Sequence, residues 1–103
     1  MTSFTSIVAQ LTTADCHPGR LDHVVETCGQ RLLQAARKEM GYRGSYLLVN
    51  RDSSQLIALS LWDTSADARA FQASKPYQVQ LLSIGDCVSG PIRSDLFDID
   101  AQS

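Results

Sequence analysis

The sequence has few cysteines and no close pair among them. Cys16, Cys28 and Cys87 are odd in number and widely spaced, which argues against a disulfide framework and against a zinc site. No apolar run approaches the roughly 20 residues needed to cross a bilayer, and the first residues lack a basic segment followed by an apolar one. We therefore expect free thiols, no metal site, no membrane partner and a cytoplasmic location.

Excess positive charge is also missing. The net charge is −2, and the nine Lys and Arg residues are scattered along the chain without forming a basic stripe. Proteins that bind nucleic acids usually concentrate positive charge on one face. We therefore expect no nucleic acid partner.

The composition that remains is typical of a globular protein. The chain has 103 residues, of which 44% are hydrophobic and 19% charged. This length predicts one domain over residues 1–103, with a frayed tail at about 101–103. A domain of this size has a marginal core if much of its apolar surface needs a second chain to cover it.

The first half of the chain predicts a strand, a helix and a second strand. Residues 4–13 are β-branched and roughly alternate between apolar and polar, as in a strand, and residues 16–19 form a turn. Apolar residues recur at helical spacing over 20–40, and Gly41 is the expected C-cap of that helix. A strand over 42–50 follows.

Two apolar runs, residues 46–49 and 56–62, flank a polar turn at 50–55 and predict a strand pair. Thr64 to Asp67 resembles a capping box that starts a helix reaching about Ala73. We expect Pro76 to interrupt it, a second helical segment over 77–84 with Val79 and Leu82 inward and Leu81 as a further candidate, and a last strand over 92–99. The fold class is α+β: a ferredoxin-like β-α-β-β-α-β arrangement with an antiparallel four-stranded sheet.

The strand over 56–62 is nearly all apolar, so both of its faces should be covered. Helices can cover one face, but two helices in one short chain cannot cover both. The same sheet from another subunit is the simplest second cover. The sequence therefore predicts a homodimer through the sheet.

Two segments resemble a known family. Residues 41–49 (GYRGSYLLV) and, after a turn, 59–68 (LSLWDTSADA) are similar to the pattern of the antibiotic biosynthesis monooxygenase-like family of dimeric α/β barrels: G-[FY]-x-G-x-x-x-L, then an apolar strand ending in W-[ED]-[ST], then an Ala-rich helix. The resemblance implies that fold. Members include cofactor-free monooxygenases of aromatic polyketides, haem-degrading enzymes, isomerases and proteins without an assigned activity.

The resemblance implies no haem chemistry for this chain. The haem-degrading branch uses an asparagine, a tryptophan and a histidine at places that here hold approximately Gln10, Phe71 and Leu81. Leucine cannot ligate iron, and the two histidines, His17 and His23, lie elsewhere. We expect no cofactor. The polyketide-oxidising branch relies on Trp, Tyr, Asn and Arg, types that this chain supplies at Trp62, Tyr46, Tyr77, Asn50 and Arg43.

Five residues are the candidates for binding a small aromatic molecule: Gln10, Tyr46, Trp62, Phe71 and Tyr77. For four of them a structural role is the alternative. Trp62 and Phe71 could be core aromatics, and Tyr77 could be a surface tyrosine. The Gln10 amide, on a mostly apolar strand, needs partners from the backbone or from a ligand.

No catalytic residue can be assigned from the sequence. Cys16 and His17 are more typical of a turn than of a nucleophile and its base. The resemblance implies a cofactor-independent monooxygenase, or a related tailoring enzyme, acting on an aromatic or polyketide-like molecule. The alternative is a non-catalytic small-molecule-binding or stress-related barrel protein. An isomerase or decarboxylase would need a polar pair in the pocket, for which Gln10 with Ser60 or Asn50 is the candidate.

Overall fold

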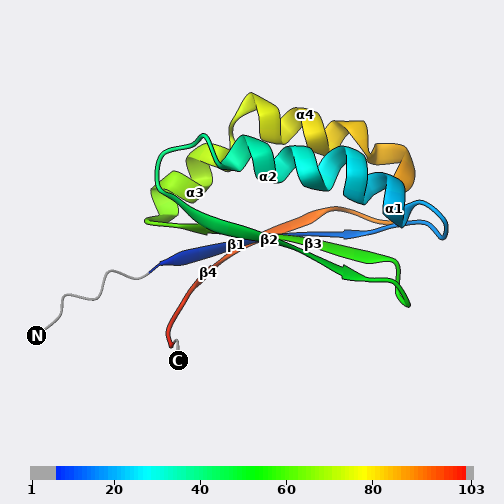
Figure 1. Cartoon of the computed structure of the whole chain (residues 1–103), viewed down its shortest axis with the longest axis horizontal. Coiled ribbons are helices and arrows are strands. Elements are labelled where there is room, and N and C mark those ends of the chain that lie inside the picture. Colours follow the sequence, from blue (N-terminus) through cyan, green and yellow to red (C-terminus); the bar gives the residue numbers. More distant parts are fainter. Residues whose placement is uncertain (1–6, 102–103) are drawn as a thin grey trace, which may run out of the picture.

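The computed structural model describes residues 7–101 and has a β-α-β-β-α-β element order (Figure 1). The elements are β1 (Val8–Asp15), α1 (Leu21–Val24), the π-helical turn η1 (Val25–Gly29), α2 (Gln30–Ala36), β2 (Tyr42–Asn50), β3 (Gln55–Trp62), α3 (Ser65–Gln72), α4 (Lys75–Ser83), the 3₁₀ turn η2 (Gly85–Cys87) and β4 (Arg93–Asp98). This is the expected ferredoxin-like α+β fold.

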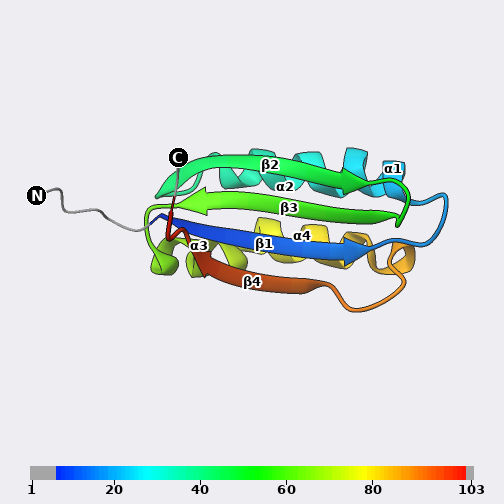
Figure 2. The same ribbon diagram turned by 90° about the horizontal axis from the view of Figure 1, so that it is seen from below.

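The four strands form one antiparallel sheet in the order β2-β3-β1-β4, as Figure 2 shows. β1 lies in the middle, where Gln10 is opposite Ser60 on β3 and Leu96 on β4. This register matters for the site because it places the polar residues of the two central strands side by side.

The helices cover one face of the sheet and leave the other face bare (Figure 1). Side chains alternate between the faces of a strand, and in β3 the buried residues are Leu56, Ala58, Ser60 and Trp62. The residues between them face away from the helices and are only half-buried. We call this second side of the sheet the open face.

The first helical region is shorter than the sequence pattern predicts. It begins at Leu21, passes through the π turn and ends at Ala36 rather than Met40. The backbone amides of Lys38 and Glu39 donate to the carbonyls of Ala35 and Ala36, three residues earlier in the chain. These bonds form a tighter, 3₁₀-like last turn, and the helix ends there. The prediction that Gly41 is its C-cap is wrong: Gly41, at φ 83°, belongs to the turn that enters β2.

The sequence correctly predicted that the second helical region is interrupted, but not which of its residues are buried. The Thr64 hydroxyl accepts from the Asp67 amide at 3.0 Å and caps α3. Pro76 lies in the first turn of α4, where a missing N–H costs nothing, so it begins that helix instead of interrupting one. Val79 and Leu82 point to solvent, at 47% and 81% exposure, whereas Tyr77 is buried and Leu81 is half-buried against the core.

The ends of the chain differ slightly from expectation. β1 begins at Val8 and reaches Asp15, two residues beyond the predicted end, while residues 4–6 lie outside the described residues. The hairpin strands have nearly the predicted bounds, and β4 covers 93–98 of the predicted 92–99. Residues 102–103 of the predicted tail are also outside the described part.

Candidate functional site

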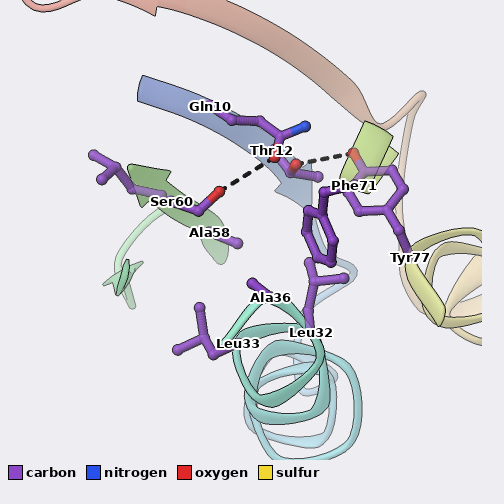
Figure 3. Close-up of a pocket in the computed structure, with 10 residues that line it drawn as sticks. Gln10, Thr12, Leu32, Leu33, Ala36, Ala58, Ser60, Phe71 and Tyr77 are labelled. Atoms are coloured by element: carbon purple, nitrogen blue, oxygen red, sulfur yellow. Dashed lines mark hydrogen bonds between the residues drawn. The ribbon is translucent and has the colours of Figure 1, made fainter. Parts of the chain in front are cut away.

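A cavity lies between the centre of the sheet and the helices (Figure 3). Its lining comes from β1, β3, α2, α3 and α4: Gln10, Thr12, Leu32, Leu33, Ala36, Ala58, Leu59, Ser60, Phe71 and Tyr77. The volume open to the centre of a water molecule is about 10 Å³. This is room for about one water, so a larger ligand enters only if side chains of the wall move.

The aromatic residues of the site form a row. Ring centroids are 5.9 Å apart for Tyr42 and Trp62, 5.2 Å for Trp62 and Phe71, and 5.3 Å for Phe71 and Tyr77. These distances are those of favourable aromatic pairs. Phe71 and Tyr77 line the cavity, whereas Trp62 lies behind Phe71 and is fully buried.

A hydrogen-bonded relay joins Trp62 to Gln10. The indole Nε1 of Trp62 donates to the Ser60 hydroxyl at 2.8 Å, and Ser60 donates to Oε1 of Gln10 at 3.2 Å. Gln10 is 1% exposed, and its Nε2 has no hydrogen-bond partner among residues 7–101. A buried amide with two free N–H groups is costly unless something accepts from it.

The Tyr77 hydroxyl, in contrast, is fully engaged. It lies 3.0 Å from the Thr12 hydroxyl and donates to the Ser94 hydroxyl at 3.1 Å. Gln72 donates to the same Ser94 oxygen at 2.6 Å. Tyr77 therefore links α4 to β1 and β4 by hydrogen bonds. It is not a surface tyrosine, and its hydroxyl is not a free donor for a ligand.

Of the five candidate residues, the structure brings four together. Gln10, Phe71 and Tyr77 line the cavity, and Trp62 touches it through Ser60 and Phe71. Tyr46 does not join them: it pairs with Leu59, lies on the open face and is 61% exposed. Tyr46 is one position from Leu47, which packs against the core, so it faces the opposite side of the sheet, and its role in binding stays a prediction.

Sequence reasoning missed Thr12 as part of the site and considered Ser60 only as a possible partner of Gln10. Both are polar residues at helix-facing positions of the central strands, where apolar residues are expected. The available signal was a polar residue opposite Gln10, Ser60, and another two positions along the strand of Gln10, Thr12. Four of the apolar lining residues cannot be distinguished in the sequence from other core residues: Leu32, Leu33, Ala36 and Ala58.

Other reactive groups do not build a second site in the described part of the chain. Burial raises the pKa of Cys28 from 9.0 to about 11, and it also raises the pKa of Cys16. All three thiols are free and buried. Within residues 7–101 no group of three or more His, Cys, Asp or Glu side chains could hold a metal ion, and no helix there is long and apolar enough to span a bilayer.

The fold and the cavity together define a ferredoxin-like domain with an internal pocket at the sheet and helix boundary. Residues 7–79, well over half of the chain, match the family model described as "Antibiotic biosynthesis monooxygenase". The chain belongs to this family. None of the curated proteins matches the sequence.

Solved structures agree on the fold. "Putative antibiotic biosynthesis monooxygenase from Nitrosomonas europaea" superimposes with a TM-score of 0.81 at 13% identity, over 97% of this chain and 96% of that one. Rv0793 from Mycobacterium tuberculosis gives 0.80 at 15% identity, over 95% and 99%. PA3566 from Pseudomonas aeruginosa gives 0.78 at 16%, over 97% and 100%. At such low identity these likenesses establish the fold alone.

Proposed function

We propose that this protein is a cofactor-independent oxygenase that binds a hydroxylated aromatic or polyketide-like molecule at the cavity beside Gln10, with side chains of the cavity wall moving aside to admit it. The observation that carries the proposal is the buried, unpartnered Nε2 of Gln10 at the wall of a mostly apolar cavity. Membership of a family described as monooxygenases supports it. The amide supplies a fixed donor to an oxygen atom of the substrate.

The proposed reaction needs few protein groups. A deprotonated substrate, whose CH₂ group is activated by a neighbouring ring system, passes electrons to dioxygen. The carbon becomes a carbonyl with one oxygen atom, the other oxygen leaves as water, and the substrate supplies all four electrons. The protein binds the anion, stabilises its charge through Gln10 and excludes bulk water.

A different class of function has its own supporting observation. Apart from Tyr77, whose hydroxyl is engaged, the residues lining the cavity carry no titratable side chain. A site without an acid or a base suits a protein that binds a small molecule and does not transform it. This non-catalytic alternative and the oxygenase share the same pocket and differ in turnover.

One experiment separates the two functions. Dithranol, a hydroxylated anthrone, is titrated against the fluorescence of Trp62, and dioxygen uptake is followed with and without protein. The oxygenase gives saturable quenching and uptake above the spontaneous rate, and Gln10→Leu abolishes the uptake. The exposed Gln30 provides the matched control, because Gln30→Leu makes the same change outside the pocket. Quenching without uptake favours the binding protein, and the absence of both overturns the pocket assignment.

We also propose that the protein is a homodimer whose sheets pack through their open faces. Three large apolar side chains are conspicuously exposed there, Tyr46 at 61%, Leu48 at 45% and Phe97 at 52%. An apolar area of this kind on a soluble domain is typical of an interaction surface. Two copies related by a two-fold axis would cover each other's patch and close a barrel.

A further inference from the structure

The direction of the Gln10 amide follows from the donors beside it. An indole N–H can only donate, so the Ser60 oxygen accepts from Trp62 Nε1 at 2.8 Å. The hydroxyl proton of Ser60 is then free to donate, and its partner is the Gln10 side chain at 3.2 Å. In the structure that atom is the carbonyl Oε1. With the amide reversed, the Ser60 oxygen would accept from both Trp62 and Gln10, and the Ser60 proton would lose the acceptor it has here. The relay therefore determines which end of the amide remains free.

The free end is the NH₂ group. Figure 3 shows Nε2 turned away from Ser60, toward the side where Thr12 and Tyr77 lie. The hydroxyls of Thr12 and Tyr77 are bonded to each other at 3.0 Å, and Tyr77 also bonds Ser94. Gln10 Nε2 is thus the buried side-chain atom of the cavity lining that still lacks a partner among residues 7–101.

We propose that Ser60, held by Trp62, is a positioning residue that turns Gln10 into a donor-only contact, so that the cavity selects ligands that present an anionic oxygen, a phenolate or an enolate. This rests on the proposed function, in that the cavity is taken as the binding site of an anion, and it adds Ser60 as the residue that fixes the direction of the amide. A neutral hydroxyl can also accept, but a hydrogen bond to a charged oxygen is the stronger.

Burial and the Gln10 amide shift the pKa of a bound phenol in opposite directions. An apolar cavity disfavours the charged form and raises the pKa of a bound phenol, whereas a donor to the charged form lowers it. The contribution of the amide is therefore the difference between the protein with Gln10 and the protein without it. A relay that was only structural would stabilise the fold without changing the ionisation of a bound phenol.

The probe is β-naphthol, whose neutral and anionic forms differ in their ultraviolet absorption, with naphthalene as the matched compound that lacks the oxygen. The pKa of bound naphthol is measured in the wild type, Gln10→Leu, Ser60→Ala and Ser60→Thr. We expect a pKa lower in the wild type than in Gln10→Leu, corresponding to roughly tenfold tighter relative binding of the anion. Ser60→Ala should lose much of that difference, and Ser60→Thr, which keeps the hydroxyl, should restore it.

Ser45 provides the control, because it lies opposite Ser60 on β2 and its hydroxyl bonds Tyr42 at 2.6 Å instead of Gln10. Ser45→Ala should leave the pKa of bound naphthol at the wild-type value. Equal pKa values in the wild type and Gln10→Leu overturn the proposal, as does equal affinity for naphthol and naphthalene throughout the pH range. Turnover of dithranol with no pKa difference refutes this inference and leaves the oxygenase standing, and a pKa difference without dioxygen uptake does the reverse.

Discussion

At the scale of single residues, the buried polar side chains fall into two groups. Some make their hydrogen bonds within the fold, and one keeps a free donor. The Thr12, Ser60 and Tyr77 hydroxyls are all hydrogen-bonded within the fold. Gln10 is satisfied at its oxygen and left open at its nitrogen. Satisfied groups rigidify the pocket, while the open one is available to a ligand. The distinction depends on hydrogen-bond direction, which is why Gln10 is the informative residue.

Cys28 gives a prediction about pH. Its thiol is 2% exposed, and burial raises its pKa from 9.0 to about 11. Above pH 9 the unfolded chain loses this proton while the folded chain keeps it, so ionisation favours unfolding. The stabilisation is complete below pH 9 and is lost as the pH rises toward 11. Urea titrations at pH 8 and pH 10.5 should show a decline of about 1–2 kcal/mol attributable to Cys28.

The Cys28→Ala variant isolates that contribution. It removes the thiol and lowers stability at both pH values by loss of packing, but its decline between them should be smaller than that of the wild type. The comparison cancels the effects of other groups that titrate in the same range. An equal decline in both proteins would show that the folded thiol ionises as readily as the unfolded one.

At the scale of elements, the sequence predicted the order of strands and helices and missed where helices end and which way they face. The hairpin of β2 and β3 was predictable because two apolar runs enclose a polar turn. The first helix was overextended because Met40 fits the apolar spacing, although it is 84% exposed in the turn after α2. Spacing alone does not reveal that a chain has already left the helix.

The phase of α4 shows the same limit. The sequence put Val79 and Leu82 inward, whereas in the structure α4 begins at Lys75 and buries Tyr77 instead. The cavity shows a similar limit: side-chain types indicated Gln10, Phe71 and Tyr77, which line it, but did not show that Tyr46 lies on the opposite face of the sheet. Tertiary placement of a helix face cannot be derived from a segment that is apolar on both sides.

Ser74 connects the two helices that carry Phe71 and Tyr77. Its hydroxyl donates to the Phe71 carbonyl at 2.6 Å and accepts from the Tyr77 amide at 3.4 Å, so it ends α3 and caps α4. Ser74→Ala should lower the free energy of unfolding by about 1 kcal/mol. Ser83→Ala, which removes an exposed hydroxyl near the end of α4, should change it by less than about 0.5 kcal/mol. Urea denaturation of both variants measures this, and equal effects would refute the capping role.

At the scale of the whole molecule, the sheet has two different faces. The helix face carries the cavity and the buried core. The open face carries exposed Tyr46, Leu48 and Phe97 and the half-buried side chain of Leu59 on β3, a residue that also borders the cavity from the sheet. The one-sided arrangement of helices in Figure 1 explains why so apolar a strand as β3 leaves half of its side chains uncovered. A second sheet packed on the open face would bury these side chains. It would also support β1 and β3, which carry Gln10 and Ser60, on the side opposite the cavity.

The proposed dimer predicts that one charged substitution on the open face changes the mass of the protein in solution. Light scattering of the wild type should give twice the mass of the chain. Leu59→Asp should give the mass of one chain, because pairing would bury a carboxylate without a partner at a cost of several kcal/mol. Leu82→Asp makes the same change at an 81% exposed position of α4, on the helix side, and should leave the dimer intact. Far-ultraviolet circular dichroism checks that Leu59→Asp remains folded, and the melting temperature of the wild type should rise with protein concentration. A wild type that is monomeric at micromolar concentration, with a melting temperature independent of concentration, would contradict the closed barrel.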